Sequence, residues 1–189
     1  GLLTFAPLFL AAFWWSERRA AWPVLPFQMF RVRGVVISSV TMFMAHFGAF
    51  VIWFIFPFYV GNNLGYGPFT LGVMMAVMAA ANTGFSSTGG WLCDRVGTTA
   101  MGTIGLTALS VGLLLMGFLD EESGLEQVAL RIALVGVGTG LFQASAFTLM
   151  MSSVPAKRFG TAGAAVALAQ SLGTVLSVAV TGGLFELSN

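Results

Sequence analysis

The sequence has little charge: only 8% of its 189 residues are Asp, Glu, Lys or Arg, whereas a soluble domain carries about 25%. So few charged side chains cannot cover a surface that faces water. Of the residues present, 57% are hydrophobic, and the mean hydropathy is +0.90. The composition therefore indicates a membrane protein.

Other scarcities exclude further classes of protein. The single cysteine, Cys93, excludes an internal disulfide and a cysteine-rich zinc site, and a net charge of +1 gives no argument for a nucleic-acid partner. There is one histidine, and no acid lies in the middle of a hydrophobic run. Nucleophile–base pairs and clustered metal ligands are therefore missing, so we expect no enzyme, no catalytic residues and no metal site.

Hydrophobic runs of roughly 20 residues divide the chain. We predict them to be helices, because a lone strand leaves its backbone unsatisfied in lipid and no alternating pattern indicates a barrel. The predicted spans are Val35–Val60, Phe69–Leu92, Ala100–Leu119, Val128–Val154 and Gly160–Leu187. Residues 1–15 form a shorter apolar stretch without an initial methionine or a signal-peptide pattern. We interpret them as the end of a truncated transmembrane helix.

The basic residues gather in alternate links between the spans. Seven of the eight lie in the first, third and fifth links: Arg18, Arg19, Arg31, Arg33, Arg95, Lys157 and Arg158. The fourth link, DEESGLEQVALR, holds four acids and one arginine. Because cytoplasmic links are the basic ones, we expect the acidic link outside. Residues 16–34, which mix arginines with aromatic side chains, are either a cytoplasmic segment at the membrane surface or an ordinary connector.

The stretch GGWLCDRVGTT places an acid beside a base between two hydrophobic runs. We expect Gly89 and Gly90 to end one helix and Asp94 to cap the start of the next, where a carboxylate meets free N–H groups and the positive end of the dipole. Arg95 can reach the cytoplasmic surface, and Gly97 allows a second tight turn. These residues form either a plain cap or a conformational latch, a contact made in one state and broken in another.

Four stretches resemble a known family. The pattern G-x-L-x-D-R-x-G, formed here by Gly90, Leu92, Asp94, Arg95 and Gly97, is similar to the signature loop of the major facilitator superfamily. The two threonines that follow stand where that loop usually has basic residues. Three more stretches, in the expected order, resemble segments of its fourteen-span drug:proton antiporters: FWWSERRAAWPVLPFQMFRVR, FPFYVGNNLGYGPFTLG and SSVPAKRFGTAGAAVALAQSLG.

The resemblance implies an all-α membrane protein, a transmembrane helix bundle that is the C-terminal half of a major facilitator fold. Residues 35–189 would supply five transmembrane helices of that half, and the last helix and the N-terminal half would be missing. The implied location is the cell membrane, multi-pass, with the bacterial inner membrane as the usual setting of such relatives. The implied partners are the lipid bilayer, a small-molecule substrate and the missing half of the same chain, with no nucleic acid.

The implied function is secondary active transport, in which small amphipathic or drug-like compounds are exported in exchange for protons by alternating access. No cofactor is implied apart from the proton gradient. The alternatives are a non-transporting membrane scaffold or assembly subunit, and a major facilitator importer of another solute.

Polar side chains inside the predicted spans are the candidates for a substrate cavity. His46 and Trp53 lie seven residues apart, so they share a helix face. An ionisable residue inside a membrane span is a functional candidate, although a neutral histidine bonded to a neighbouring helix is an equal alternative. Asn82 can either line a cavity or bond across helices. Gln143 and Gln170 are further cavity candidates on the last two predicted spans.

Small residues mark the expected helix contacts. Gly136 and Gly140 are four residues apart, a spacing that lets two helices approach closely. Gly163 begins a long face of small and polar residues on the last predicted span. We predict all three glycines to be helix-packing positions.

Overall fold

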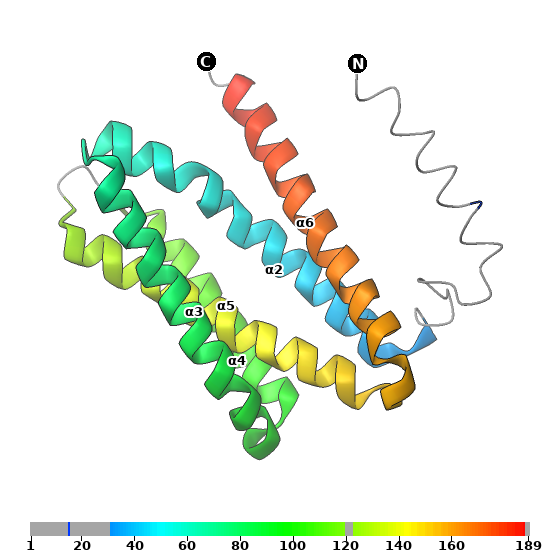
Figure 1. Cartoon of the computed structure of the whole chain (residues 1–189). Helices are drawn as coiled ribbons and strands as arrows, with labels where there is room; N and C mark the ends of the chain where they lie inside the picture. Colours follow the sequence, from blue (N-terminus) through cyan, green and yellow to red (C-terminus); the bar gives the residue numbers. More distant parts are fainter. Residues whose placement is uncertain (1–14, 16–30, 120–122, 188–189) are drawn as a thin grey trace.

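The computed structural model describes residue 15 and residues 31–119 and 123–187, which are mostly helical and contain no strand. Its five long helices are α2 (Arg33–Phe58), α3 (Pro68–Val96), α4 (Thr98–Met116), α5 (Leu125–Ser152) and α6 (Phe159–Leu187) (Figure 1). A π-helical turn, η3 (Tyr59–Asn63), continues α2, and a short 3₁₀ helix, η4 (Ala156–Arg158), precedes α6. All five long helices are long and apolar enough to cross a membrane. The predicted transmembrane helix bundle is thereby confirmed.

Two of the sequence predictions lie largely outside the described residues. Residues 1–14, interpreted as the end of a truncated helix, are one of them. The other is the link at residues 16–34, of which only the last four residues are described.

The five helices form two groups. α2 packs along α6, while α5 packs against both α3 and α4. Although α5 and α6 are consecutive in the chain, they hardly touch, and the two groups meet mainly where α2 contacts α5. Figure 1 shows α6 beside α2, with α3, α4 and α5 gathered on the other side of α2. We call the boundary between the α2–α6 pair and the α3–α4–α5 group the seam.

Helix α5 lies at the centre of its group: 61% of its most apolar stretch is buried, against 11–33% in the other four helices. Two glycines explain how closely α3 approaches it. A Cβ atom at Gly136 would lie 2.5 Å from the carbonyl oxygen of Met78, and one at Gly140 would lie 2.5 Å from the carbonyl oxygen of Asn82. Backbone therefore meets backbone at both positions, and only glycine leaves room for it.

The same segment of α5 also touches α4 through a residue that the sequence analysis did not single out. A Cβ at Gly138 would overlap the backbone of Leu109 on α4. Gly163 on α6 differs, because the nearest atom to its Cβ would be Met150 Cε, at 4.0 Å. An ordinary van der Waals contact needs no glycine, so no contact among the described residues requires one at position 163, and the packing role of Gly163 stays a prediction.

One residue joins α3 to α4. Gly97 has φ +94°, a conformation that L side chains rarely adopt, and it lets the chain reverse between the two helices. Its N–H donates to the Cys93 carbonyl at 2.9 Å, and its own carbonyl accepts from the N–H of Met101 at 3.2 Å. These two bonds attach both helix ends to Gly97, so the turn is short and closed.

The helix ends around this turn differ from our expectation. Gly89 and Gly90 do not end α3, which continues through them to Val96. Asp94 lies in the last turn of α3 and does not cap α4, whose start has no side-chain capping bond. The reason lies in packing: a Cβ at Gly89 would come within 3.0 Å of the Ala144 side chain on α5. Gly89 therefore lies within α3, where its small size allows close contact with α5.

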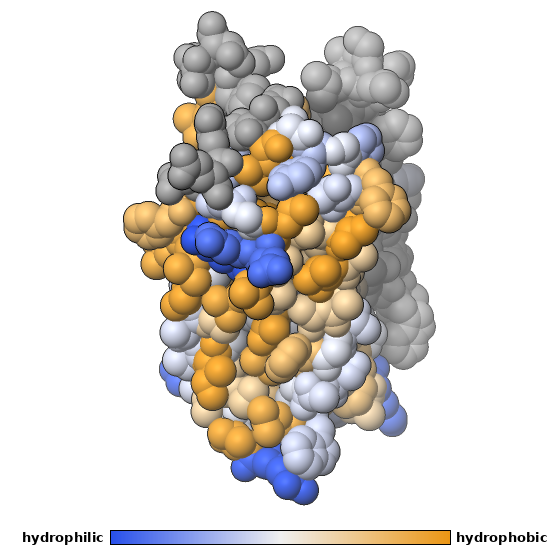
Figure 2. Space-filling model, turned by 90° about the vertical axis from the view of Figure 1, so that its left-hand side faces the viewer, coloured by the Kyte–Doolittle hydropathy of each residue, from blue (hydrophilic) through white to orange (hydrophobic). Residues whose placement is uncertain are grey.

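Charged residues lie near the ends of the helices. Each long helix crosses the membrane once, so alternate connections lie on the same side. One side therefore carries the start of α2 (Arg33), the end of α3 (Arg95) and η4 (Lys157 and Arg158). The start of α5, with Glu126 in its first turn, falls on the other. Figure 2 shows one face of the molecule, where apolar residues predominate and strongly hydrophilic ones form a few small groups, one of them at the lower edge. This distribution suits a surface in contact with lipid.

Candidate functional site

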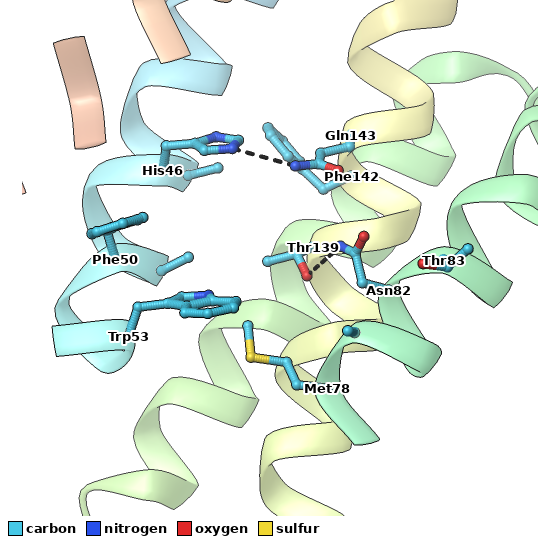
Figure 3. Close-up of a pocket in the computed structure, with 12 residues that line it drawn as sticks. His46, Phe50, Trp53, Met78, Asn82, Thr83, Thr139, Phe142 and Gln143 are labelled. Atoms are coloured by element: carbon cyan, nitrogen blue, oxygen red, sulfur yellow. Dashed lines mark hydrogen bonds between the residues drawn. The ribbon is translucent and has the colours of Figure 1, made fainter. Parts of the chain in front are cut away.

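A partly open cavity of about 300 Å³ lies at the seam. Its walls come from α2 on one side and from α3 and α5 on the other (Figure 3). The apolar part of the wall consists of Phe50, Trp53, Met78 and Phe142, together with three alanines. Small-molecule sites are typically concave, mostly apolar and of this order of size.

The α2 wall is built by helical spacing. His46, Phe50 and Trp53 follow one another at intervals of four and three residues, so their side chains share one face. Figure 3 shows His46 and Trp53 projecting toward α3 and α5, with Phe50 between them along α2. The rings of Phe50 and Trp53 are stacked, with centroids 6.4 Å apart and an interplanar angle of 17°. Trp53 is 43% exposed, which leaves much of its aromatic surface available to a flat apolar ligand.

The opposite wall is fixed by a bond between α3 and α5. Asn82 donates from Nδ2 to Thr139 Oγ1 at 2.9 Å, and the Thr139 hydroxyl donates in turn to the Val135 carbonyl at 2.9 Å. This arrangement uses one of the two amide hydrogens of Asn82. The side chain therefore retains hydrogen-bonding capacity at the cavity wall.

His46 is the point where three helices are joined by polar contacts. Its Nδ1 lies 3.0 Å from the Met42 carbonyl oxygen, one turn earlier on α2. Its Nε2 lies 2.6 Å from Gln170 Nε2 on α6 and 3.3 Å from Gln143 Nε2 on α5. A histidine placed in this way links the α2–α6 pair to the α3–α4–α5 group across the seam.

All described residues that line the cavity are uncharged. The polar groups among them are the side chains of His46, Asn82, Thr83, Thr139 and Gln143. Amides, hydroxyls and a neutral imidazole can donate and accept hydrogen bonds without demanding a charged partner. The described part of the wall thus suits uncharged or weakly polar aromatic compounds better than strongly charged solutes.

The structure brings together the five side chains that the sequence singled out as cavity candidates. His46, Trp53, Asn82 and Gln143 line the cavity, and Gln170 reaches His46 from α6. Phe50, Thr83, Thr139 and Phe142 also line it and were not predicted. For Phe50 the signal was available, since it lies one turn after His46. For Thr139 and Phe142, only the contact of α5 with α3 and α2 reveals the role.

The candidate latch residues lie apart from this cavity, around the turn between α3 and α4. Asp94 and Arg95 are exposed on the last turn of α3, and Gly97, which follows the helix, is exposed as well. The Arg95 guanidinium stacks over the Trp91 ring, with its Cζ 3.9 Å from the centroid. Gly90 is inside α3 and has no neighbouring atom within 4 Å of an added Cβ. Asp94 and Arg95 are therefore presented on the surface at a membrane end of the bundle.

Five apolar helices long enough to cross a membrane, with a partly open cavity between α2, α3 and α5, define a multi-pass membrane protein. Comparison with known families agrees with this class. Residues 38–189 match the Major Facilitator Superfamily, and the chain belongs to that family of transporters. The match points to transport and not to enzymatic catalysis.

Individual relatives share moderate sequence identity with the chain. It is 28% identical over 172 residues to the multidrug resistance protein Stp of Mycobacterium tuberculosis, which covers 91% of the chain and 32% of that protein. It is 28% identical over 182 residues to the tetracenomycin C resistance and export protein of Streptomyces glaucescens, covering 96% of the chain and 34% of that protein. The chain therefore spans about a third of the length of these curated relatives.

Proposed function

We propose that this chain is the C-terminal half of a fourteen-span drug:proton antiporter, and that the complete protein exports small amphipathic compounds in exchange for protons. In this proposal residues 35–189 supply five transmembrane helices of that half, without its last helix, residues 16–34 are its cytoplasmic or interfacial link, and residues 1–15 end the preceding helix. The protein acts in the bacterial cell membrane, with the lipid bilayer and the other half of the same protein as its partners.

The cavity at the seam is the observation that carries this proposal. It combines aromatic rings with neutral hydrogen-bonding groups, a combination that accepts varied ligands. Relatives named for multidrug resistance and for export support the outward direction. The cavity is partly open, and the second half of the protein would complete it. Alternating access then follows when one half rocks against the other around the bound compound.

Transport by the complete protein tests this function. In inverted membrane vesicles whose lumen has been made acidic, protons leaving the lumen should drive accumulation of a lipophilic aromatic dye inside, and a protonophore should abolish the accumulation. Dye movement that ignores the protonophore would contradict proton exchange. Movement only in the opposite direction would favour an importer, and no movement of any tested compound would favour a membrane scaffold.

We further propose that Gly90, Asp94, Arg95 and Gly97 form a conformational latch. Two features support it: Gly97 couples α3 and α4 through one residue, and the neighbouring charges are exposed at the membrane end. An exposed carboxylate at this position is available to dock on a helix end of the other half.

Replacing Asp94 by asparagine tests the latch. The change keeps the shape and removes the charge, so we expect a several-fold fall in the transport rate with unchanged membrane insertion, measured in the complete protein. Glu126→Gln is the matched control, because Glu126 is exposed at the opposite membrane side. Equal transport by the Asp94→Asn variant and the parent would reduce the loop to a simple connection.

A further inference from the structure

The bonding of His46 defines its hydrogen positions. A carbonyl oxygen only accepts, so the 3.0 Å contact with Met42 places a hydrogen on Nδ1. In the neutral ring Nε2 then carries a lone pair, and it faces the amide nitrogens of Gln143 and Gln170. The chain has no other histidine. His46 is also central in α2, 13 residues from Arg33 and 12 from Phe58 at its ends, which corresponds to roughly 20 Å of helix on each side.

The two glutamines do not share Nε2 equally. One lone pair serves one donor well, and Gln170, at 2.6 Å, is closer than Gln143, at 3.3 Å. Gln170 belongs to α6, the partner of α2, whereas Gln143 lies across the seam and lines the cavity. Gln170 is therefore the main hydrogen-bond partner of His46, whereas Gln143 makes the longer contact and also faces the cavity.

A carboxamide can form a hydrogen bond with the imidazole in either of its charge states. Toward neutral His46 it presents its NH₂ group, and after a half-turn it presents its carbonyl oxygen to a protonated Nε2–H. The polar groups facing His46 from the other helices of the cavity are the amides of Gln143 and Gln170 and, farther along the wall, Asn82 and Thr139. None of these is charged or titratable, so a proton on His46 would be the one charge on the described wall.

We propose that His46 is a proton-binding site of this half, and that Gln143 couples its proton to the ligand in the cavity. The proposal rests on the proposed antiport function. A proton from water adds to the Nε2 lone pair, forming an N–H bond and a positive ring, and the reverse step returns the proton to water. Because Nδ1 stays bonded to Met42 in both states, the ring keeps its orientation throughout.

The orientation of the Gln143 amide determines that the ligand and the proton compete. When His46 is neutral, the Gln143 NH₂ group points to Nε2, which leaves the carbonyl oxygen for a ligand that donates a hydrogen bond. When His46 is protonated, its Nε2–H donates to the Gln170 carbonyl oxygen. The positive ring also turns the Gln143 amide dipole, so that the Gln143 oxygen faces the ring and is lost to the ligand. An aromatic compound with a hydroxyl or N–H group therefore binds the neutral form more tightly, and by linkage it promotes release of the proton. Mutually exclusive occupancy of this kind is what exchange of a compound for a proton needs.

The proton site is tested on the chain itself, in lipid nanodiscs, without any transport step. With ¹³C,¹⁵N-histidine the chain gives one imidazole signal set, because it has one histidine. We expect the Nδ1–H tautomer at high pH and a single one-proton transition as the pH is lowered. Gln170→Leu should move the midpoint by at least about 0.5 pH unit, whereas Asn82→Leu, an amide without a bond to His46, should leave it in place. The Nε2–H tautomer, no transition, or equal midpoints in Gln170→Leu and the unaltered chain would overturn the site.

The coupling is tested with two aromatic probes that differ by one hydrogen-bond donor, 1-naphthol and 1-methoxynaphthalene. Equilibrium dialysis against the nanodiscs, corrected with empty discs, gives their affinities. We expect the dissociation constant of 1-naphthol to be at least about threefold higher at pH 5 than at pH 8. 1-Methoxynaphthalene should show no such change, and Gln143→Leu should remove the change for 1-naphthol.

Equal pH dependence of the two probes, or none for either, would contradict the coupling. If His46 titrates but the complete protein exports nothing, the proposed function is wrong and the proton site is still supported. Conversely, proton-driven export with an imidazole that never titrates would keep the function and remove His46 from it.

Discussion

Replacing Gly140 by alanine is expected to destabilise the helix bundle by about 1–3 kcal/mol, the usual cost of forcing an extra carbon into a filled contact. The added Cβ would lie 2.5 Å from the Asn82 carbonyl oxygen and 3.0 Å from the Ser86 backbone nitrogen. Both atoms belong to the backbone of α3, so neither can move aside by a change of rotamer. Helices α3 and α5 must separate, and Gly140→Leu should prevent folding altogether.

Gly84→Ala is the matched control for this prediction. Gly84 also lies within a membrane-spanning helix, α3, but no heavy atom would lie within 4 Å of its Cβ. Alanine favours a helix over glycine by up to about 1 kcal/mol, so this variant should be as stable as the parent or slightly more stable. Unfolding of the purified chain by a graded increase of denaturing detergent measures both. If Gly140→Ala unfolds together with Gly84→Ala, the close approach of α3 and α5 is not a determinant of stability.

Replacing Ala79 by tryptophan is expected to reduce ligand affinity and transport by roughly tenfold or more, which corresponds to about 1.4 kcal/mol of binding free energy. Ala79 lines the cavity and is exposed, so the indole enters the space between α2 and α3 without displacing buried residues. A cavity of about 300 Å³ then retains too little room for a drug-sized compound.

Ala80→Trp tests whether this loss is specific. Ala80 is the next residue, is exposed in the same way, and points about 100° around α3 from Ala79. It should therefore tolerate tryptophan with little change in transport. Dye efflux by cells that express equal amounts of each variant provides the comparison. A loss of efflux that is equal at both positions would mean that bulk on α3, and not filling of the cavity, is responsible.

Hydropathy was sufficient to predict the spanning helices, because in lipid the backbone must satisfy its own hydrogen bonds and the length of a span is set by the bilayer. The helix ends were less predictable. Gly89 and Gly90 looked like terminators, yet α3 continues through them to Val96. In a membrane protein a glycine can serve close helix contact as well as a turn, and one sequence alone does not distinguish the two uses.

The candidate site was predictable within each helix but not between helices. Spacing placed His46 and Trp53 on one face of α2. It gave no information on the contact of His46 with Gln170, which is separated from it by 124 positions in the chain. Small residues were misleading in the same way: Gly136, Gly140 and Gly163 look alike in sequence, and only the first two lie against another backbone. Pairing of faces is decided by the packing of whole helices.

Protection of a cysteine in the cavity tests the central claim most directly. In a complete protein with Cys93 replaced by serine, Ala79→Cys and Ala80→Cys are labelled with a maleimide in the presence and absence of a compound that the protein exports. The seam cavity predicts that the compound slows labelling at position 79 by several-fold and leaves position 80 unchanged. Labelling at position 79 that is unaffected by saturating compound would contradict a binding site between α2, α3 and α5.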